Sequence, residues 1–108
     1  MTTSKTDTND KEERNAMSYS SQFDLSRKVA IVTGGTGILG QHFCAGLAES
    51  GANIAVVDLL VDEAHEFAQT LIENYGVKAI GCGCDVSDPI SVQAMVADVV
   101  AEFGEINI

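Results

Sequence analysis

Four glycines fall within residues 34–40, where an apolar segment gives way to a helical pattern. The preceding segment, "KVAIVT" at residues 28–33, is apolar on both alternating faces, as a strand buried between two layers of helices must be. Gly35, Gly37 and Gly40 have the spacing G-x-G-x-x-G. A turn without side chains lets a pyrophosphate reach the N-terminus of the following helix, where unpaired N–H groups and the helix dipole favour negative charge. The sequence therefore predicts a dinucleotide-binding turn.

Asp58 ends a second apolar segment, "NIAVVD" at residues 53–58. A carboxylate about 20 residues beyond the glycines is the group that accepts hydrogen bonds from the adenosine ribose hydroxyls in dinucleotide-binding folds. A glycine-rich turn alone is a weak signal, but this turn lies between a predicted strand and a predicted helix and has its acidic partner. The alternative is a tight turn and a strand-end aspartate without a ligand.

Strand and helix patterns alternate along the chain. A third strand is expected at residues 77–85, and helices with one apolar face at residues 62–75 and 89–103. Asp88 followed by Pro89 is a good start for the second of these helices. The alternation predicts an α/β fold with a Rossmann-type, doubly wound parallel sheet. The glycines expected to end the helices are Gly51, Gly76 and Gly104.

The chain divides into a tail and one partial domain. Residues 1–22 are polar and lack periodicity, which predicts a disordered tail. Residues 23–108 are expected to be the first βαβαβα half of an NAD-binding Rossmann domain, truncated at the start of a fourth strand, "INI" at residues 106–108. The expected spatial strand order is 3-2-1-4. With so little of strand four, several side chains of the last helix should be partly exposed, namely Val92, Val96, Val99 and Phe103.

The charge distribution excludes several classes of partner. The net charge is −10, and no Lys or Arg occurs between Lys28 and Lys78. No basic patch exists to neutralise phosphates, so neither nucleic acid nor a membrane is an expected partner. The chain has no apolar run long enough to span a bilayer and no signal-peptide pattern at its N-terminus, which predicts a soluble, cytoplasmic protein.

The three cysteines, Cys44, Cys82 and Cys84, indicate neither a disulfide framework nor a metal centre. On an extended strand Cys82 and Cys84 would point to one face as small apolar fillers. Zinc normally needs four grouped ligands, and the only histidines are His42 and His65. No metal site is predicted.

Four motifs, taken together, resemble the short-chain dehydrogenases/reductases over residues 23–108. "FDLSRKVAIVTGGTGILG" is similar to that family's first strand and cofactor turn, and "AESGANIAVVDL" to the end of its first helix and its second strand. "CDVSDPISV" resembles its third-strand motif, and "VAEFGEINI" the approach to its fourth strand. Ile38 departs from the non-extended branch pattern T-G-x-x-x-G-x-G and gives the spacing of the extended, epimerase-like branch. The later motifs resemble the non-extended branch, which we favour.

The resemblance implies how a cofactor would be bound. Thr33 and Gly34 would shape the turn, residues 36–39 would present N–H groups to the phosphates, and Gly40 would let the helix pack on the sheet. Asp58 would bind the ribose. Leu59, Asp85 and Val86 would surround the adenine. The complete set of expected cofactor-binding residues is Thr33, Gly34, Gly35, Thr36, Gly37, Ile38, Leu39, Gly40, Asp58, Leu59, Asp85 and Val86.

NAD(H) is expected in preference to NADP(H). The Asp58 carboxylate would face a 2′-phosphate at close range, and no cationic side chain lies near it in the sequence.

In the family the chemistry is hydride transfer between nicotinamide and a hydroxyl or carbonyl carbon, run by a tyrosine acid/base, a lysine and a serine. Neither Tyr19 nor Tyr75 has a lysine four residues on, so no catalytic residue is assigned. The prediction is the N-terminal part of an NAD-dependent oxidoreductase acting on a small alcohol or carbonyl compound, inactive as 108 residues alone and a homo-oligomer at full length. The alternatives are a stand-alone nucleotide-binding module without catalysis, or a fragment of an extended-branch epimerase- or dehydratase-like enzyme.

Overall fold

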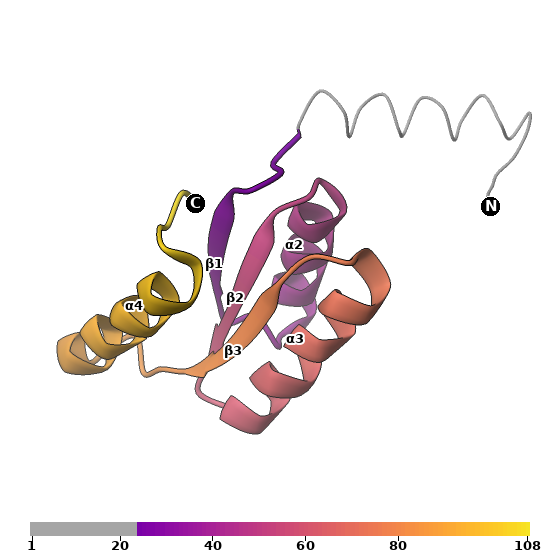
Figure 1. The fold of residues 1–108 in the computed structure, drawn as a ribbon. Coiled ribbons are helices and arrows are strands. Elements are labelled where there is room, and N and C mark those ends of the chain that lie inside the picture. Colours follow the sequence, from indigo (N-terminus) through magenta and orange to yellow (C-terminus); the bar gives the residue numbers. More distant parts are fainter. Residues whose placement is uncertain (1–23) are drawn as a thin grey trace, which may run out of the picture.

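The computed structural model describes residues 24–108 and contains one parallel sheet with three helices (Figure 1). The strands, hydrogen-bonded in the order β1-β2-β3, are β1 (Val29–Thr33), β2 (Asn53–Asp58) and β3 (Ala79–Gly83). The helices that follow them are α2 (Ile38–Glu49), α3 (Val61–Tyr75) and α4 (Pro89–Phe103). This order confirms the predicted α/β class and the Rossmann-type βαβαβα half. The tail predicted at residues 1–22 lies outside the described residues.

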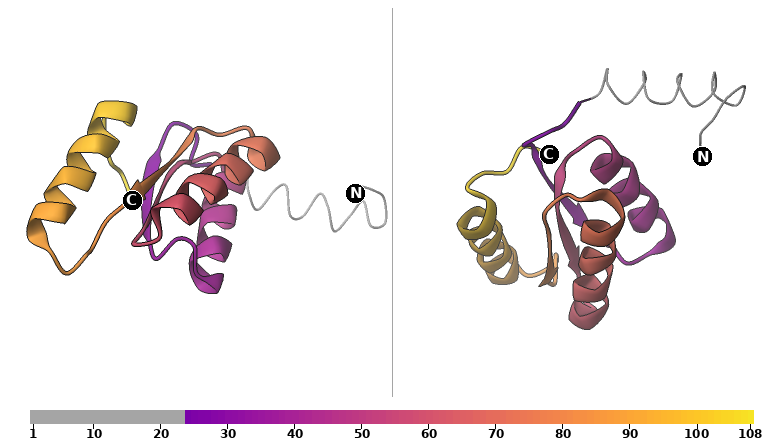
Figure 2. Two further views of the ribbon diagram at one scale, coloured as in Figure 1. Left: turned by 90° about the horizontal axis from the view of Figure 1, so that it is seen from below. Right: turned by 45° about the vertical axis from the view of Figure 1, so that its right-hand side comes forward.

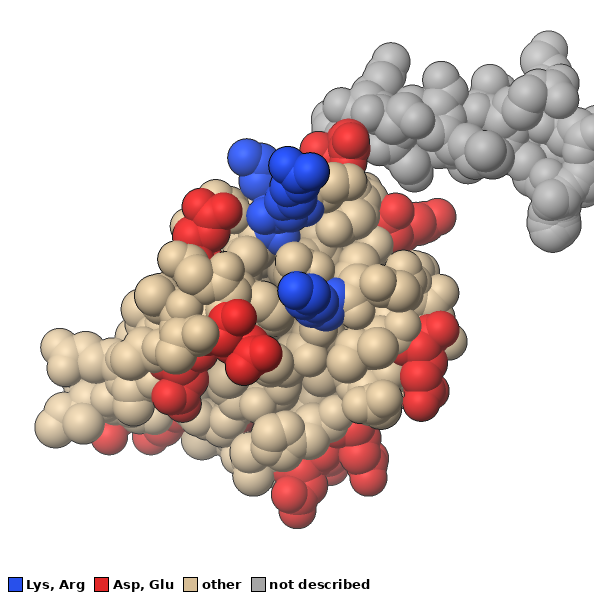
Figure 3. All heavy atoms as spheres, viewed as in Figure 1, with Lys and Arg blue, Asp and Glu red and all other residues tan. Residues whose placement is uncertain are grey.

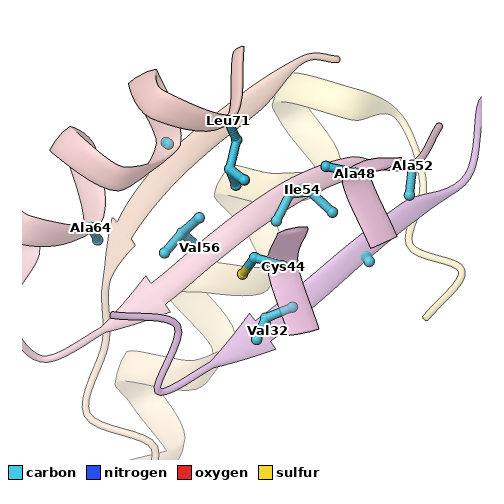
Figure 4. Close-up of a cluster of buried hydrophobic side chains, with 10 residues drawn as sticks. Val32, Cys44, Ala48, Ala52, Ile54, Val56, Ala64 and Leu71 are labelled. Atoms are coloured by element: carbon cyan, nitrogen blue, oxygen red, sulfur yellow. The ribbon is translucent and has the colours of Figure 1, made fainter. Parts of the chain in front are cut away.

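Helices cover both faces of the sheet (Figure 2). Helices α2 and α3 pack on one face, where Ile54 and Val56 of β2 meet the helix residues Cys44 and Leu71 (Figure 4). Helix α4 packs on the other face, against the alternate β2 residues Ala55 and Val57. Residues 54–57 are completely buried. This two-sided burial explains why the β2 sequence is apolar at successive positions.

The β3 strand alternates glycine with cysteine, and the two residue types face different helices. A Cβ atom at Gly81 would lie 2.5 Å from the backbone of Ala64 and His65, so α3 packs directly on the strand there. The side chains of Cys82 and Cys84 are buried on the α4 face, which confirms their prediction as apolar fillers. The sequence reasoning did not explain the glycines, because their need depends on how closely α3 approaches.

The last residues of the chain run beside the edge of β1 that β2 leaves free. The N–H groups of Asn107 and Ile108 donate to the carbonyl of Val29 at 2.9 and 3.0 Å, and the N–H of Ile31 donates to the carbonyl of Ile108 at 3.1 Å. Strand four would therefore begin next to β1, as the predicted order 3-2-1-4 requires.

The orientation of α4 corrects one expectation. Val99 was expected to be partly exposed, but it is completely buried against the sheet, and Met95 is buried with it. Val92 and Phe103 are half-buried, as expected. The outward-facing large apolar side chains of this helix are those of Ile90, Val96 and Val100. The helix packs against side chains from all three existing strands, so its central residues are covered even without a complete strand four.

Helix α4 begins as the sequence predicted, and its cap offers a first test. The Asp88 carboxylate accepts a hydrogen bond from the Ile90 N–H at 3.1 Å, and Pro89 occupies the first helical turn. Replacing Asp88 with alanine is expected to lower the free energy of unfolding by about 1 kcal/mol, whereas Asp88→Ser should retain most of the stability. Urea denaturation of the full-length protein measures both. Equal stabilities for the two variants would show that the cap does not contribute.

Candidate site at the C-terminal edge of the sheet

The three strands end at the same edge of the sheet, and their loops enclose a hollow of about 280 Å³. Open α/β sheets bind ligands outside the carboxyl ends of their strands, so this is the expected position of a site. Six of the residues predicted to bind a cofactor line this hollow: Thr33, Gly34, Asp58, Leu59, Asp85 and Val86. Val57 and Cys84 complete the lining. Three loops that are distant in sequence are thus brought together.

The other predicted residues form the turn from β1 into α2. Gly34 has a φ of +65°, a left-handed conformation that favours glycine. A Cβ atom at Gly35 would lie 2.7 Å from Cγ1 of Val56, and one at Gly40 would overlap the carbonyl oxygen of Gly34. Gly37 is the N-cap of α2, with an ordinary φ of −73°. Three of these glycines are therefore required by the turn itself.

Gly37 differs from the other three because nothing within the turn requires it to be glycine. A Cβ atom there would meet only the Gly34 carbonyl oxygen, at 3.4 Å, which is an ordinary contact. No side chain caps the N-terminus of α2, and the two following side chains, Ile38 and Leu39, are 82% and 66% exposed. The helix start is therefore open to the solvent.

Asp58 is held by hydrogen bonds from both neighbouring loops. Its Oδ2 accepts from the Thr36 hydroxyl at 2.7 Å and from the Thr36 N–H at 3.2 Å, and its Oδ1 accepts from the Leu60 N–H at 3.1 Å. The Thr36 hydroxyl, followed by the Leu60 N–H, keeps the pKa of Asp58 below its ordinary value. The carboxylate is therefore ionised at neutral pH.

Asp85 is held within its own loop. Its Oδ1 accepts from the Ser87 hydroxyl at 2.6 Å and from the Ser87 N–H at 3.0 Å, and these bonds lower the pKa of Asp85. The Asp85 N–H donates to the hydroxyl of Ser91 at 3.0 Å, which ties the loop to the first turn of α4. The second carboxylate of the site is thus also oriented and ionised.

Gln41 is a residue that the sequence reasoning missed. Its side-chain amide donates to the carbonyl of Thr36 at 2.8 Å, and its N–H donates to the carbonyl of Gly37 at 2.8 Å. Both bonds fasten the glycine turn to the first turn of α2. No pattern in the sequence distinguishes this glutamine, because its role appears only when the turn folds back on the helix.

Positive charge lies away from this edge. Within residues 24–108 the only Lys and Arg side chains are those of Arg27, Lys28 and Lys78, and each precedes a strand, at the opposite edge of the sheet. The basic side chains visible in Figure 3 accordingly lie in the upper half of that face, where the strands begin. An anionic group at the C-terminal edge therefore meets no Lys or Arg side chain of the described part.

The described part of the chain holds no group of three or more His, Cys, Asp or Glu side chains suited to a metal ion. All three cysteines are free and buried, and burial raises the pKa of Cys44 to about 11.

Within residues 24–108, no helix combines the length and apolar character needed to cross a bilayer.

Comparison with known proteins gives one consistent result. The sequence model of the short chain dehydrogenase family matches residues 28–108. The chain is 41% identical over 92 residues to D-threitol dehydrogenase of Mycolicibacterium smegmatis, which covers 85% of this chain and 35% of that relative.

Solved structures with this fold include two sugar- or polyol-converting enzymes. L-sorbose reductase of Gluconobacter frateurii, complexed with NADPH and L-sorbose, superposes with a TM-score of 0.73 at 38% identity, over 76% of this chain and 31% of that protein. An NAD+-bound xylitol dehydrogenase superposes with a TM-score of 0.72 at 34% identity, over 77% and 32% respectively. The chain thus spans about a third of the length of the proteins that it matches.

Proposed function

The chain belongs to the short-chain dehydrogenase family, and on this basis we propose that its full-length protein is an NAD-dependent oxidoreductase that interconverts an alcohol and a carbonyl compound. The observation that carries the proposal is the hollow at the C-terminal edge of the sheet, in which the oriented carboxylate of Asp58 lies beside the glycine turn. The cofactor would supply or accept the hydride. The names of similar proteins favour a polyol or the corresponding keto sugar as the first substrate class to test.

The adenosine half of the cofactor fits the hollow. Leu59 and Val86 are 70% and 61% exposed on its walls, and an adenine ring between them would cover apolar surface that is now in water. Asp58 would accept a hydrogen bond from a ribose hydroxyl, and Asp85 would accept one from an amino group of the base.

The pyrophosphate fits the uncapped start of α2. The first N–H groups of a helix lack partners within the helix, and the dipole there favours an anion. Gly37 has no structural need to be glycine, which supports the close approach of a ligand at this position. Gly35 and Gly40 would act indirectly, by letting the turn and the helix pack closely enough to form the site.

The preference for NAD rests on charge. A 2′-phosphate on the ribose would be placed against the ionised Asp58 carboxylate, in a part of the described structure without Lys or Arg. Proteins similar to this chain include both NADPH-bound and NAD+-bound forms, so the fold alone does not choose between the cofactors.

No residue of this chain is proposed to be catalytic. Tyr75 ends α3 and does not line the hollow that holds Asp58, and no lysine lies four residues beyond it. The residues of this chain would bind and orient the cofactor. Cytoplasmic location, homo-oligomerisation, and the lack of nucleic-acid or membrane partners remain predictions from the sequence.

The test is the affinity of the full-length protein for NAD(H) and NADP(H), measured by calorimetry. NAD(H) should bind more tightly, and Asp58→Ala should weaken it by at least about tenfold, because hydrogen bonds to a charged group contribute about 1.5–3 kcal/mol. Asp58→Asn serves as the matched control, since it keeps the shape, removes the charge and should improve NADP(H) binding. Tighter binding of NADP(H) to the parent would contradict the cofactor assignment, and binding of neither would contradict the oxidoreductase.

A further inference from the structure

The Asp58 carboxylate accepts hydrogen bonds from two different loops. Three donors converge on it, two from Thr36 in the loop after β1 and one from Leu60 in the loop after β2. Because the donors engage both oxygens, they restrict rotation about both side-chain torsions. The two loops are therefore joined through this one carboxylate.

Thr36 is itself held from the other side. Gln41 donates its side-chain amide to the Thr36 carbonyl, so a continuous set of hydrogen bonds runs from α2 through Thr36 to Asp58. Thr36 is half-buried and lines a second hollow, of about 380 Å³, together with Gln41 and Glu63. The bond from Gln41 thus fixes the backbone of Thr36, and the Thr36 hydroxyl donates to Asp58 from that fixed position.

From this geometry we infer that Thr36 is a positioning residue, whose hydroxyl sets the orientation of the Asp58 carboxylate and thereby the preference for a free ribose 2′-hydroxyl over a 2′-phosphate. The inference rests on the proposed function, because it concerns the same cofactor site. An ionised carboxylate has about four acceptor positions, so three internal donors still leave room for a ribose hydroxyl. A carboxylate that is already oriented loses less conformational freedom when the ribose binds.

Thr36 also differs from the role that the family resemblance suggested for it. Its N–H was expected to face the phosphates, whereas in this structure it donates to Asp58. The side chain and the backbone of one residue therefore serve the same carboxylate.

Thr36→Val and Thr36→Ser form a matched pair for the test. Valine keeps the β-branched shape and the backbone N–H but removes the hydroxyl donor, whereas serine keeps the hydroxyl. In the full-length protein Thr36→Val should weaken NAD binding about five- to tenfold, the effect of about one lost hydrogen bond. NADP binding should change less, so the ratio of NAD affinity to NADP affinity should fall. Thr36→Ser should keep the NAD affinity within about twofold of the parent.

NMR titration of the Asp58 carboxyl carbon provides a readout that a loss of packing would not move. The pKa of Asp58 should rise in Thr36→Val and return towards the parent value in Thr36→Ser. The other charged groups nearby, Asp85 in the same hollow and Glu63 beside Thr36, are identical in all three proteins.

Three results would overturn the inference: parental NAD affinity in Thr36→Val, equal weakening in both variants, or an Asp58 pKa that does not respond to loss of the hydroxyl. A parent that binds neither dinucleotide would overturn the proposed function instead. In that case the titration still decides whether Thr36 orients Asp58.

Discussion

Gly40→Ala is expected to destabilise the domain by about 3 kcal/mol, at the upper end of the range for overpacked sites. The added Cβ atom would overlap the backbone carbonyl oxygen of Gly34 and lie 2.9 Å from Cα of Gly35. No side-chain rotation can relieve a clash with backbone, so α2 must move away from the turn. That movement would separate the start of α2 from the glycine turn and disturb the site at the same time.

Gly46 provides the matched control in the same helix. It is exposed in α2, and a Cβ atom there would meet nothing within 4 Å. Gly46→Ala should therefore stabilise the protein by about 0.5–1 kcal/mol, the ordinary gain for alanine over glycine in a helix. Urea denaturation of the two variants and the parent measures both effects. The packing assignment would be wrong if Gly40→Ala and Gly46→Ala changed the free energy of unfolding in the same direction.

Residues 1–108 by themselves are expected to aggregate or to unfold without a cooperative transition. On the free edge of β1 the chain supplies residues 107–108 and nothing further, so within residues 24–108 the Thr33 N–H has no partner on that side. An open apolar edge of this kind pairs readily with other chains. On α4 the side chains of Val96 and Val100 are 37% and 42% exposed.

The energetic basis of this expectation is the small margin of protein stability. A large apolar side chain left in water forgoes up to about 1.5–3 kcal/mol, against a typical total of about 5–15 kcal/mol. Because Val99 is completely buried, less hydrophobic stabilisation is lost than the sequence suggested. The expected instability therefore depends more on the open edge of β1.

Thermal unfolding of the isolated chain, with and without NAD, measures its stability, and two glutamate variants separate the causes. Val100→Glu places a charge on the exposed face and should reduce aggregation. Val99→Glu buries the charge and should abolish any folded state. A soluble monomer with a cooperative transition that NAD shifts upwards would contradict the expectation and favour the stand-alone binding module.

The sequence by itself was sufficient for the elements and their order. The strands at β1 and β2, the helix over residues 89–103 and its Asp88 cap agree with the structure within one residue. These features depend on local periodicity and on the preferences of single residues for turns and caps, which can be read from neighbouring positions. The location of the site follows from the same local pattern, because parallel strands end at one edge.

Only the tertiary structure decided how the segments contact one another. The bond from Thr36 to Asp58 joins residues 22 positions apart, and no local pattern indicates which donor a strand-end carboxylate will meet. The need for glycine at Gly81 depends on the distance between α3 and β3, and the burial of Val99 depends on which strands α4 covers. Each of these contacts forms between segments that become neighbours only when the chain folds, so its physical cause lies in the packing of the whole domain.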